Sequence, residues 1–312
     1  MSDVRGTDLA RRLPGGAPVE ALDRWWNTLR WLRVGQLYGR VWFRAYRPRP
    51  DLKPAPTLRF GGTPWVEPAD HAASLLAPEL VSLLDETREI GSARAWDAPE
   101  VSKLWRYHLH YFDDLSARDA ASRSTWHESL LHRWVAENPP GRGTGWEPYP
   151  TSRRIVNWIK WSLAGGQLSP TTRDSLAAQT RYLGGRLEWH LLGNHLLSNA
   201  KALVFAGAFF AGAEADGWRE RGLAIIDQQL GEQILADGGH FELSPMYHAL
   251  ALEDVLDLVN LARSWPGRVP PELLERLIGL VPAMLHWLDC MCHPDGDIAL
   301  FNDSALDVAP TR

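Results

Sequence analysis

The sequence is poor in cysteine and has no strong excess of charge of either sign. Its 312 residues include two cysteines, Cys290 and Cys292, with a single residue between them. That spacing is too short for an ordinary structural disulfide, so a disulfide-stapled fold is excluded. The formal net charge of −5 gives no overall bias toward nucleic acid or an anionic membrane, and no nucleic-acid partner is expected. An anionic ligand would need a local basic site.

Long apolar runs are also missing. The first 13 residues contain five charged side chains where a signal peptide would need an unbroken apolar stretch, which favours a cytoplasmic location. The most apolar stretch, 200–212, is too short to cross a bilayer, so no transmembrane segment is predicted. It is typical of a buried core helix.

Arginine and tryptophan are abundant near the N-terminus. No acidic residue lies between Arg24 and Arg49, where arginines alternate with tryptophan, leucine and phenylalanine at helical spacing. This pattern predicts a basic amphipathic helical arm. Attachment to an anionic membrane is one interpretation; the favoured one docks the aromatic side on the main body and leaves the arginines in water. A proline-rich connector, 48–68, then predicts a boundary between an N-terminal part, 1–69, and a main domain, 70–312.

The main domain is predicted to be all-α. Apolar residues recur at three- and four-residue spacing, with proline or glycine between segments and no run of alternating strand residues. Many sequential helices with short loops favour hairpins packed around a common axis, with loops at one end forming a groove. The predicted helices are 71–89, 113–137, 151–165, 171–185, 187–212, 216–235, 245–264, 271–279 and 281–291.

A polar stripe marks the predicted helix that contains His190. This residue, Asn194, Ser198 and Lys201 follow one another at steps of four, four and three residues, which places them on one helical face. His195 lies at the flank. Because leucines cover most of the rest, these polar groups must bond other helices, water or a ligand. An interhelical network and a binding site both fit the pattern.

A Gly-Gly loop leads into the next candidate segment. Ser244 has the character of an N-cap and Pro245 that of a first helical residue. Tyr247 and His248 would then lie in the first turn, where the helix dipole favours a phenolate and disfavours an imidazolium. Both groups would shift toward proton-accepting forms, although the same pattern also occurs without catalytic meaning.

A third candidate segment, 138–154, is rich in glycine, aromatic and charged residues. Its glycines are too irregular for a nucleotide-binding loop. Trp146 and Tyr149 could stack on sugar rings, and Arg142 or Arg153 could hold a carboxylate or sulfate. A packed turn that caps the next helix is the alternative.

Five strings resemble the heparinase II/III-like polysaccharide lyase family in the same order. The family's helical part is an incomplete α/α toroid followed by a β-sandwich, with the substrate cleft between them. Its members cleave uronic-acid-containing polysaccharides by β-elimination, and many are periplasmic, which is the alternative location. The strings are LWRYHLHYF (104–112), NPPGRGTGWEPYPTSRRIVNWIKW (138–161), LLGNHLLSNAKALVFAGAFF (191–210), DGGHFELSPMYHALALEDVLDL (237–258) and HPDGDIALFND (293–303).

The resemblance assigns roles to particular residues. It implies that Asn194 binds the uronate carboxylate, with help from His195, and that Tyr247 acts in proton transfer. No cofactor or metal is expected, because Cys290, Cys292 and His293 lack a second pair of zinc ligands. The further residues expected to contact substrate are His110, Tyr111, Arg142, Trp146, Glu147, Arg153, His240 and His248.

The expected partners are an anionic polysaccharide and a β-sandwich domain that is separate or missing. The chain stops at Arg312, where the resemblance implies that the sandwich begins, so low activity of this chain alone is expected. The polymer, heparin/heparan sulfate-like or alginate-like, is left open. One rival function is a noncatalytic or vestigial glycan-binding protein. The other is a glycoside hydrolase that uses two carboxylates among Glu147, Asp237, Glu242 and Asp254.

Overall fold

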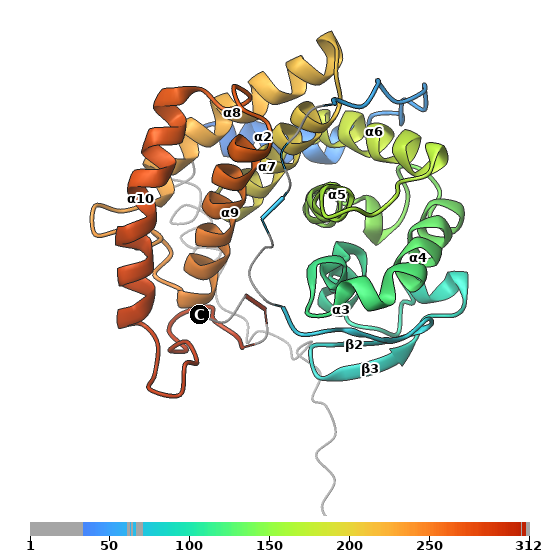
Figure 1. Cartoon of the computed structure of the whole chain (residues 1–312), viewed down its shortest axis with the longest axis horizontal. Helices are drawn as coiled ribbons and strands as arrows, with labels where there is room; N and C mark the ends of the chain where they lie inside the picture. The colour runs from blue at the N-terminus through green and yellow to red at the C-terminus, as the bar shows by residue number, and fades with distance from the viewer. Residues whose placement is uncertain (1–33, 61–62, 64, 67–70, 307, 310–312) are drawn as a thin grey trace, which may run out of the picture.

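Helices arranged around a ring make up most of the molecule (Figure 1). The computed structural model describes residues 34–60, 63, 65–66, 71–306 and 308–309. The prediction of a mainly helical, incomplete toroid is confirmed. The α-helices of these ranges are α2 (Val34–Ala45), α3 (Lys103–Tyr111), α4 (Ser124–Glu137), α5 (Pro148–Leu163), α6 (Pro170–Gly184), α7 (Gly193–Phe209), α8 (Ala213–Gln233), α9 (Pro245–Ser264) and α10 (Pro271–Cys290).

The predicted helix 71–89 was wrong, because this segment forms a small antiparallel sheet. Its strands are β1 (Leu75–Ala77), β2 (Leu80–Leu83) and β3 (Glu86–Glu89), in that order. Leu84 and Asp85 join the last two strands with φ angles of 51° and 58°, the positive values that a two-residue hairpin turn requires. The leucines of this segment follow neither a clear helical nor a clear strand spacing, so the sequence did not predict the turn.

Other predicted helix boundaries also differ from those in the structure. The predicted pair 271–279 and 281–291 is one helix, α10, which contains Pro282. Sequence analysis missed α3, and the start of the predicted helix 113–137 is 3-10 turns. The predicted helix 187–212 begins only at Gly193, so His190 lies in the preceding turn and does not share the face of Asn194.

Helix α7 is the core of the ring and packs most closely on α8. A Cβ atom at Gly222 would lie 2.6 Å from the carbonyl oxygen of Ala200, and one at Gly207 would lie 2.4 Å from that of Ala215. Only glycine lets the two backbones approach this far. The largest fully buried side chains of the described residues include Trp96, Trp105, Trp134 and Trp158.

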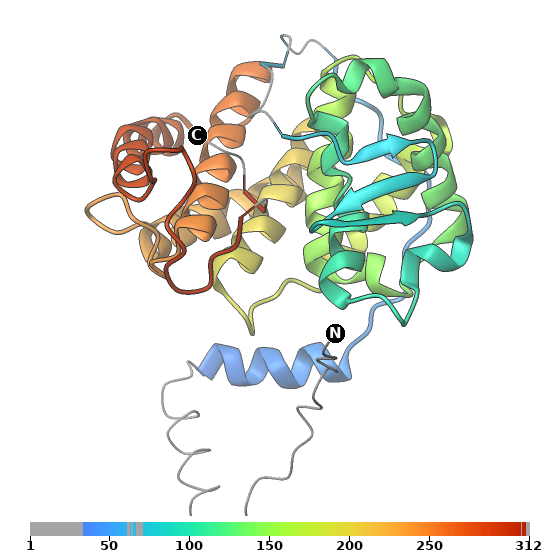
Figure 2. The same cartoon turned by 90° about the horizontal axis from the view of Figure 1, so that it is seen from below.

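The predicted arm is described only from residue 34, and 24–33 lie outside the described residues. Helix α2 lies outside the ring (Figure 2) and contacts it through Phe43, whose ring centroid is 4.3 Å from that of His190. Tyr38 and Trp42 remain 67% and 47% exposed, so the predicted docking of the aromatic side holds only in part. The boundary at 69/70 stays a prediction. None of the helices in the described ranges is long and apolar enough to cross a membrane.

A buried charge network joins α5, α7 and α9. The ammonium of Lys201 lies 2.7 Å from Asp254 and 2.6 Å from Asp257, and Lys160 lies 3.0 Å from Asp257. These four side chains are at most 7% exposed. The neighbouring carboxylates hold the pKa of Lys201 above its usual range against the opposing effect of burial, which is the largest single influence on it. Of the two interpretations of the polar stripe, the interhelical network is therefore the correct one for Lys201.

Replacing Lys201 by methionine should destabilise the fold by about 3–5 kcal/mol, because two buried carboxylates would lose their shared cation. Urea unfolding at neutral pH would measure the change. Lys53→Met is the matched control: Lys53 pairs with Asp51 and Glu214, but its side chain is 55% exposed, and little change is expected. Equal effects of the two substitutions would show that the buried network does not stabilise the fold.

Candidate functional site

The N-terminal turns of α5, α7 and α9 gather at one end of the ring. They carry Tyr149, the pair Asn194 and His195, and Tyr247, respectively. The rings of Tyr149 and His195 are in contact, with centroids 4.6 Å apart. Tyr149 is also among the groups that raise the pKa of Tyr247, so the two phenols lie close enough to interact electrostatically. Residues from three sequence segments thus form one site.

The backbone that introduces α7 is strained. Leu192 has φ 61° and ψ −151°, a combination that residues other than glycine rarely adopt, and Gly193 follows with a positive φ. This turn places Asn194 in the first helical turn, where backbone N–H groups have no intrahelical partner. A cavity of about 400 Å³ lies beside it, lined by Asn194, His195, Phe241 and Glu242. The site therefore offers amide donors to an anionic group.

A carboxylate held by hydrogen bonds lies beside His195. Its Nδ1 lies 3.2 Å from Glu188 Oε2, and its side chain is 32% exposed. Glu188 is itself held by Asn199, whose side chain donates to the Glu188 carboxylate and accepts from its backbone N–H at 3.1 and 2.8 Å. Asn199 also donates to Ser152 Oγ on α5. Asn199 of α7 and Ser152 of α5 thus hold the carboxylate that lies beside the imidazole.

Tyr247 is paired with a carboxylate that sequence analysis did not single out. Its hydroxyl donates to Asp303 Oδ2 at 3.1 Å. Ser244 caps α9 as predicted, accepting from the N–H of Tyr247, but the predicted shift toward a phenolate was wrong. Burial, then the hydrogen bond to Asp303, raises the pKa of Tyr247 to about 12, so the phenol is neutral at ordinary pH. Asp303 lies 56 residues away in sequence, and nothing in the local pattern indicated the pair.

Glu242 closes the site on the side of the Gly-Gly loop. Its carboxylate reaches the start of α7, where a Cβ at Gly193 would lie 2.9 Å from Oε1. Burial raises its pKa, while His195 opposes the shift. A bulkier residue at 193 would displace this carboxylate.

Three of the predicted substrate contacts are core residues. His110 uses both ring nitrogens inside the protein, bonding the carbonyl oxygen of Trp96 at 2.9 Å and accepting from Trp134 at 3.0 Å. Trp146 is 3% exposed and packs edge-on against Tyr182, while Tyr111 is 6% exposed. These three side chains thus pack inside the protein and do not line the cavity beside Asn194.

His240 and His248 are also buried and form the base of the Gly-Gly loop. The N–H of His240 donates to His248 Nδ1 at 3.2 Å, and His248 Nε2 bonds the carbonyl oxygen of Met284 at 2.9 Å. Both side chains are fully buried, which contradicts a direct contact with substrate. Burial lowers the pKa of His240 to about 4. It also lowers the pKa of His248, which is the predicted direction, although the prediction attributed the shift to the helix dipole.

Of the remaining predicted substrate contacts, some are already bonded to other side chains and one is exposed. Arg153 is tied to Asp113 at 3.2 Å and belongs to the buried charge network through Glu253. Glu147 accepts from the Tyr107 hydroxyl and pairs with Lys103 at 2.8 Å. Arg142 is exposed on its loop, and its contact with substrate stays a prediction.

The heparinase II/III N-terminus family model matches residues 116–310, more than half of the chain. The chain belongs to the heparinase II/III family. Among its relatives, the heparin-sulfate lyase of Bacteroides stercoris is 33% identical over 115 residues, covering 36% of this chain and 17% of the relative. The heparin-sulfate lyase of Bacteroides thetaiotaomicron is 24% identical over 280 residues, covering 83% and 36%. The family member described here thus spans about a third or less of these relatives' length.

Solved structures were also matched. The heparan sulfate lyase HepC from Pedobacter heparinus is 20% identical, with a TM-score of 0.47 over 84% of this chain and 44% of that one. A structure of heparinase III is likewise 20% identical, with a TM-score of 0.47 over 69% of this chain and 34% of that one.

Acid should destabilise the protein through its buried neutral histidines. The pKa of His240 is about 4 in the fold and near 6.5 when unfolded, so between these values the unfolded chain binds the extra proton. The contribution of His240 to the free energy of unfolding is therefore fully present above pH 6.5 and is lost as the pH falls toward 4. Urea unfolding from pH 7.5 to 5 should show a loss of about 2 kcal/mol from this residue. His240→Gln should remove that part of the slope.

His132→Gln is the control for this pH dependence, because His132 is exposed on α4. Its slope should match that of the unaltered protein. If the His240 variant also keeps the original slope, the acid sensitivity does not arise at this side chain.

Proposed function

We propose that the chain forms the toroid part of a lyase that cleaves a uronic-acid-containing polysaccharide by β-elimination. Family membership and relatives named heparin-sulfate lyases support this proposal and favour a heparan sulfate-like polymer over an alginate-like one. The observation that carries it is the position of Glu242, which lines the cavity with Asn194 and His195. Glu242 also interacts electrostatically with His195 and with the hydrogen-bonded pair of Tyr247 and Asp303.

The chemistry needs an anion-stabilising group at the uronate carboxylate. Removal of the C5 proton leaves negative charge on the carboxylate as an enediolate. The side-chain amide of Asn194 and the free N–H groups at the start of α7 would donate hydrogen bonds to that charge. This placement lowers the energy of the intermediate more than that of the bound substrate.

Proton transfer then divides between two groups. His195, with Nδ1 beside Glu188, is positioned to accept the C5 proton on its other nitrogen. The C5–H electron pair forms the C4–C5 double bond as the C4–O bond breaks. Tyr247, a neutral phenol bonded to Asp303, would donate its proton to the departing oxygen. Asp303 is the partner of Tyr247 in this scheme, and His240 and His248, which the sequence predicted to contact substrate, take no part in it.

The structure gives less support to a hydrolase. Asp254 is buried in its ion pair with Lys201, and Glu147 is engaged by Tyr107 and Lys103. Neither carboxylate is available to flank a glycosidic bond as the two-carboxylate mechanism requires. A glycan-binding protein without turnover remains the second candidate, and the assay below separates it from a lyase.

Asn194→Ala and Tyr247→Phe should each reduce turnover by at least about a hundredfold, the usual cost of losing an oxyanion donor or a positioned acid. The variants would be made in the chain joined to a β-sandwich domain of the family and assayed on heparan sulfate. Ultraviolet absorbance of the unsaturated uronate product measures turnover, and a hydrolase would not produce it.

Tyr182→Phe is the matched control, since Tyr182 packs in the core against Trp146 and should tolerate loss of its hydroxyl. Near-normal rates for the Asn194 or Tyr247 variant would remove the proposed roles. Binding of heparan sulfate without any unsaturated product, in the unaltered protein, would favour the glycan-binding candidate.

A further inference from the structure

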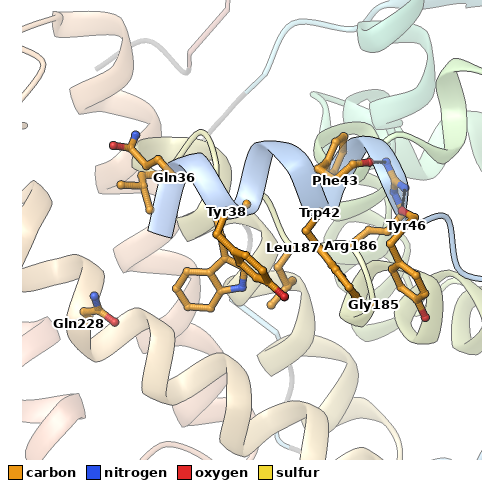
Figure 3. Close-up of a pocket in the computed structure, with 12 residues that line it drawn as sticks. Gln36, Tyr38, Trp42, Phe43, Tyr46, Gly185, Arg186, Leu187 and Gln228 are labelled. Carbon is orange, nitrogen blue, oxygen red and sulfur yellow. Dashed lines mark hydrogen bonds between the residues drawn. The ribbon is translucent and has the colours of Figure 1, made fainter. Parts of the chain in front are cut away.

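Three aromatic side chains form a ladder along one side of α2. Tyr38 and Trp42 lie on α2, and Tyr46 follows its last residue, Ala45. Their four-residue spacing places the three rings in one row (Figure 3). Their ring centroids are 6.2 Å and 4.6 Å apart, with interplanar angles of 17° and 25°. The three residues are 67%, 47% and 40% exposed, although large aromatic residues are usually buried.

The ladder faces a cavity of about 480 Å³ between α2 and the turn that follows α6. We call this cavity the aromatic groove. Besides the ladder, its lining includes the amide side chains of Gln36 and Gln228 and the guanidinium of Arg186. Flat apolar surfaces with a few convergent polar groups are typical of small-molecule sites. Pyranose rings match this lining, because they have apolar C–H faces and hydroxyl edges.

Positive charge borders the aromatic groove. Residues 34–50 contain four arginines and no acidic residue, and Arg40, Arg44 and Arg47 are exposed. Arg186 is fixed within the groove, with its guanidinium 4.0 Å from the centroid of the Phe43 ring and a 2.7 Å hydrogen bond to the carbonyl oxygen of Tyr46. A ligand in the groove would therefore be favoured if it carried carboxylate or sulfate groups.

The aromatic groove adjoins the candidate catalytic site. Gln36 and Leu192 line both the groove and the cavity beside Asn194 and His195. A polymer whose uronate lies at Asn194 would reach the ladder within the same continuous surface.

We propose that the aromatic groove binds further sugar rings of an acidic polysaccharide whose uronate lies at Asn194. This inference rests on the proposed function and adds a second binding region to it. The ladder stacks on pyranose faces, Gln228 bonds hydroxyl groups, and the arginines attract sulfate or carboxylate groups. Helix α2 is then a substrate-binding element.

Binding of heparan sulfate fragments of defined length to the 1–312 chain tests this inference. Trp42→Ala should weaken binding of a dodecasaccharide by about tenfold, the scale of one lost aromatic stack with its buried area. Binding of a tetrasaccharide, which fills only the cavity at Asn194, should not change. Trp42→Phe should restore most of the dodecasaccharide affinity. Val41→Ala is the control, since Val41 is 69% exposed on α2 and does not line the groove.

The outcomes separate the two proposals. If Asn194→Ala weakens the tetrasaccharide but Trp42→Ala leaves the dodecasaccharide unchanged, the proposed function stands and the groove proposal fails. If only Trp42→Ala has an effect, sugar binding by the groove stands, but the role of Asn194 and the link between the groove and a uronate at Asn194 both fail. An equal loss in the Val41 variant would overturn the groove proposal. So would vesicles of anionic phospholipid that bind through Trp42 while oligosaccharide binding is unaffected, because that result assigns the ladder to a membrane surface.

Discussion

The pairing of Lys201 with two buried aspartates fixes the arrangement on which the rest of the molecule depends. The cation comes from α7 and the aspartates, Asp254 and Asp257, from α9, while Lys160 of α5 shares Asp257. Buried charges tolerate little displacement, because each would lose far more by separation than a surface pair would. The three helices are therefore held in one register. Their N-terminal turns carry the candidate catalytic residues, so the network also sets the spacing of the site.

Burial and a local carboxylate, more than helix position, decide the chemistry of Tyr247. The helix dipole at an N-terminus favours an ionised phenol, but its effect is modest at a partly exposed position. Here burial and the hydrogen bond to Asp303 act in the opposite direction and raise the pKa of the phenol. The residue is therefore suited to donating a proton, and the basic step needs another group.

Periodicity and capping predicted the helices that carry the site and the Ser244 cap, although α7 begins six residues later than the predicted helix 187–212. The site roles came from the family resemblance. Sequence could not predict which polar residues face inward: His110 and His248 resembled ligand contacts, yet each has partners inside the protein, the latter 36 residues away. Sequence analysis missed the sheet at 75–89 because a distant partner also stabilises it. Its first strand is anchored by Asp114, which accepts from the N–H groups of Ser74 and Leu75.

The proline-rich connector has a consequence for how α2 stays in place. Arg181 of α6 donates to the carbonyl oxygens of Lys53 and Pro54, which fastens the chain a few residues beyond the end of α2. Docking of α2 is thus an intramolecular event with a very short tether, for which effective concentrations are about millimolar or higher. A small contact around Phe43 is then enough to keep α2 on the ring. A longer tether would lower the effective concentration of α2 at the ring, so a smaller fraction of molecules would have α2 docked. No residue in the contact between α2 and the ring would have changed.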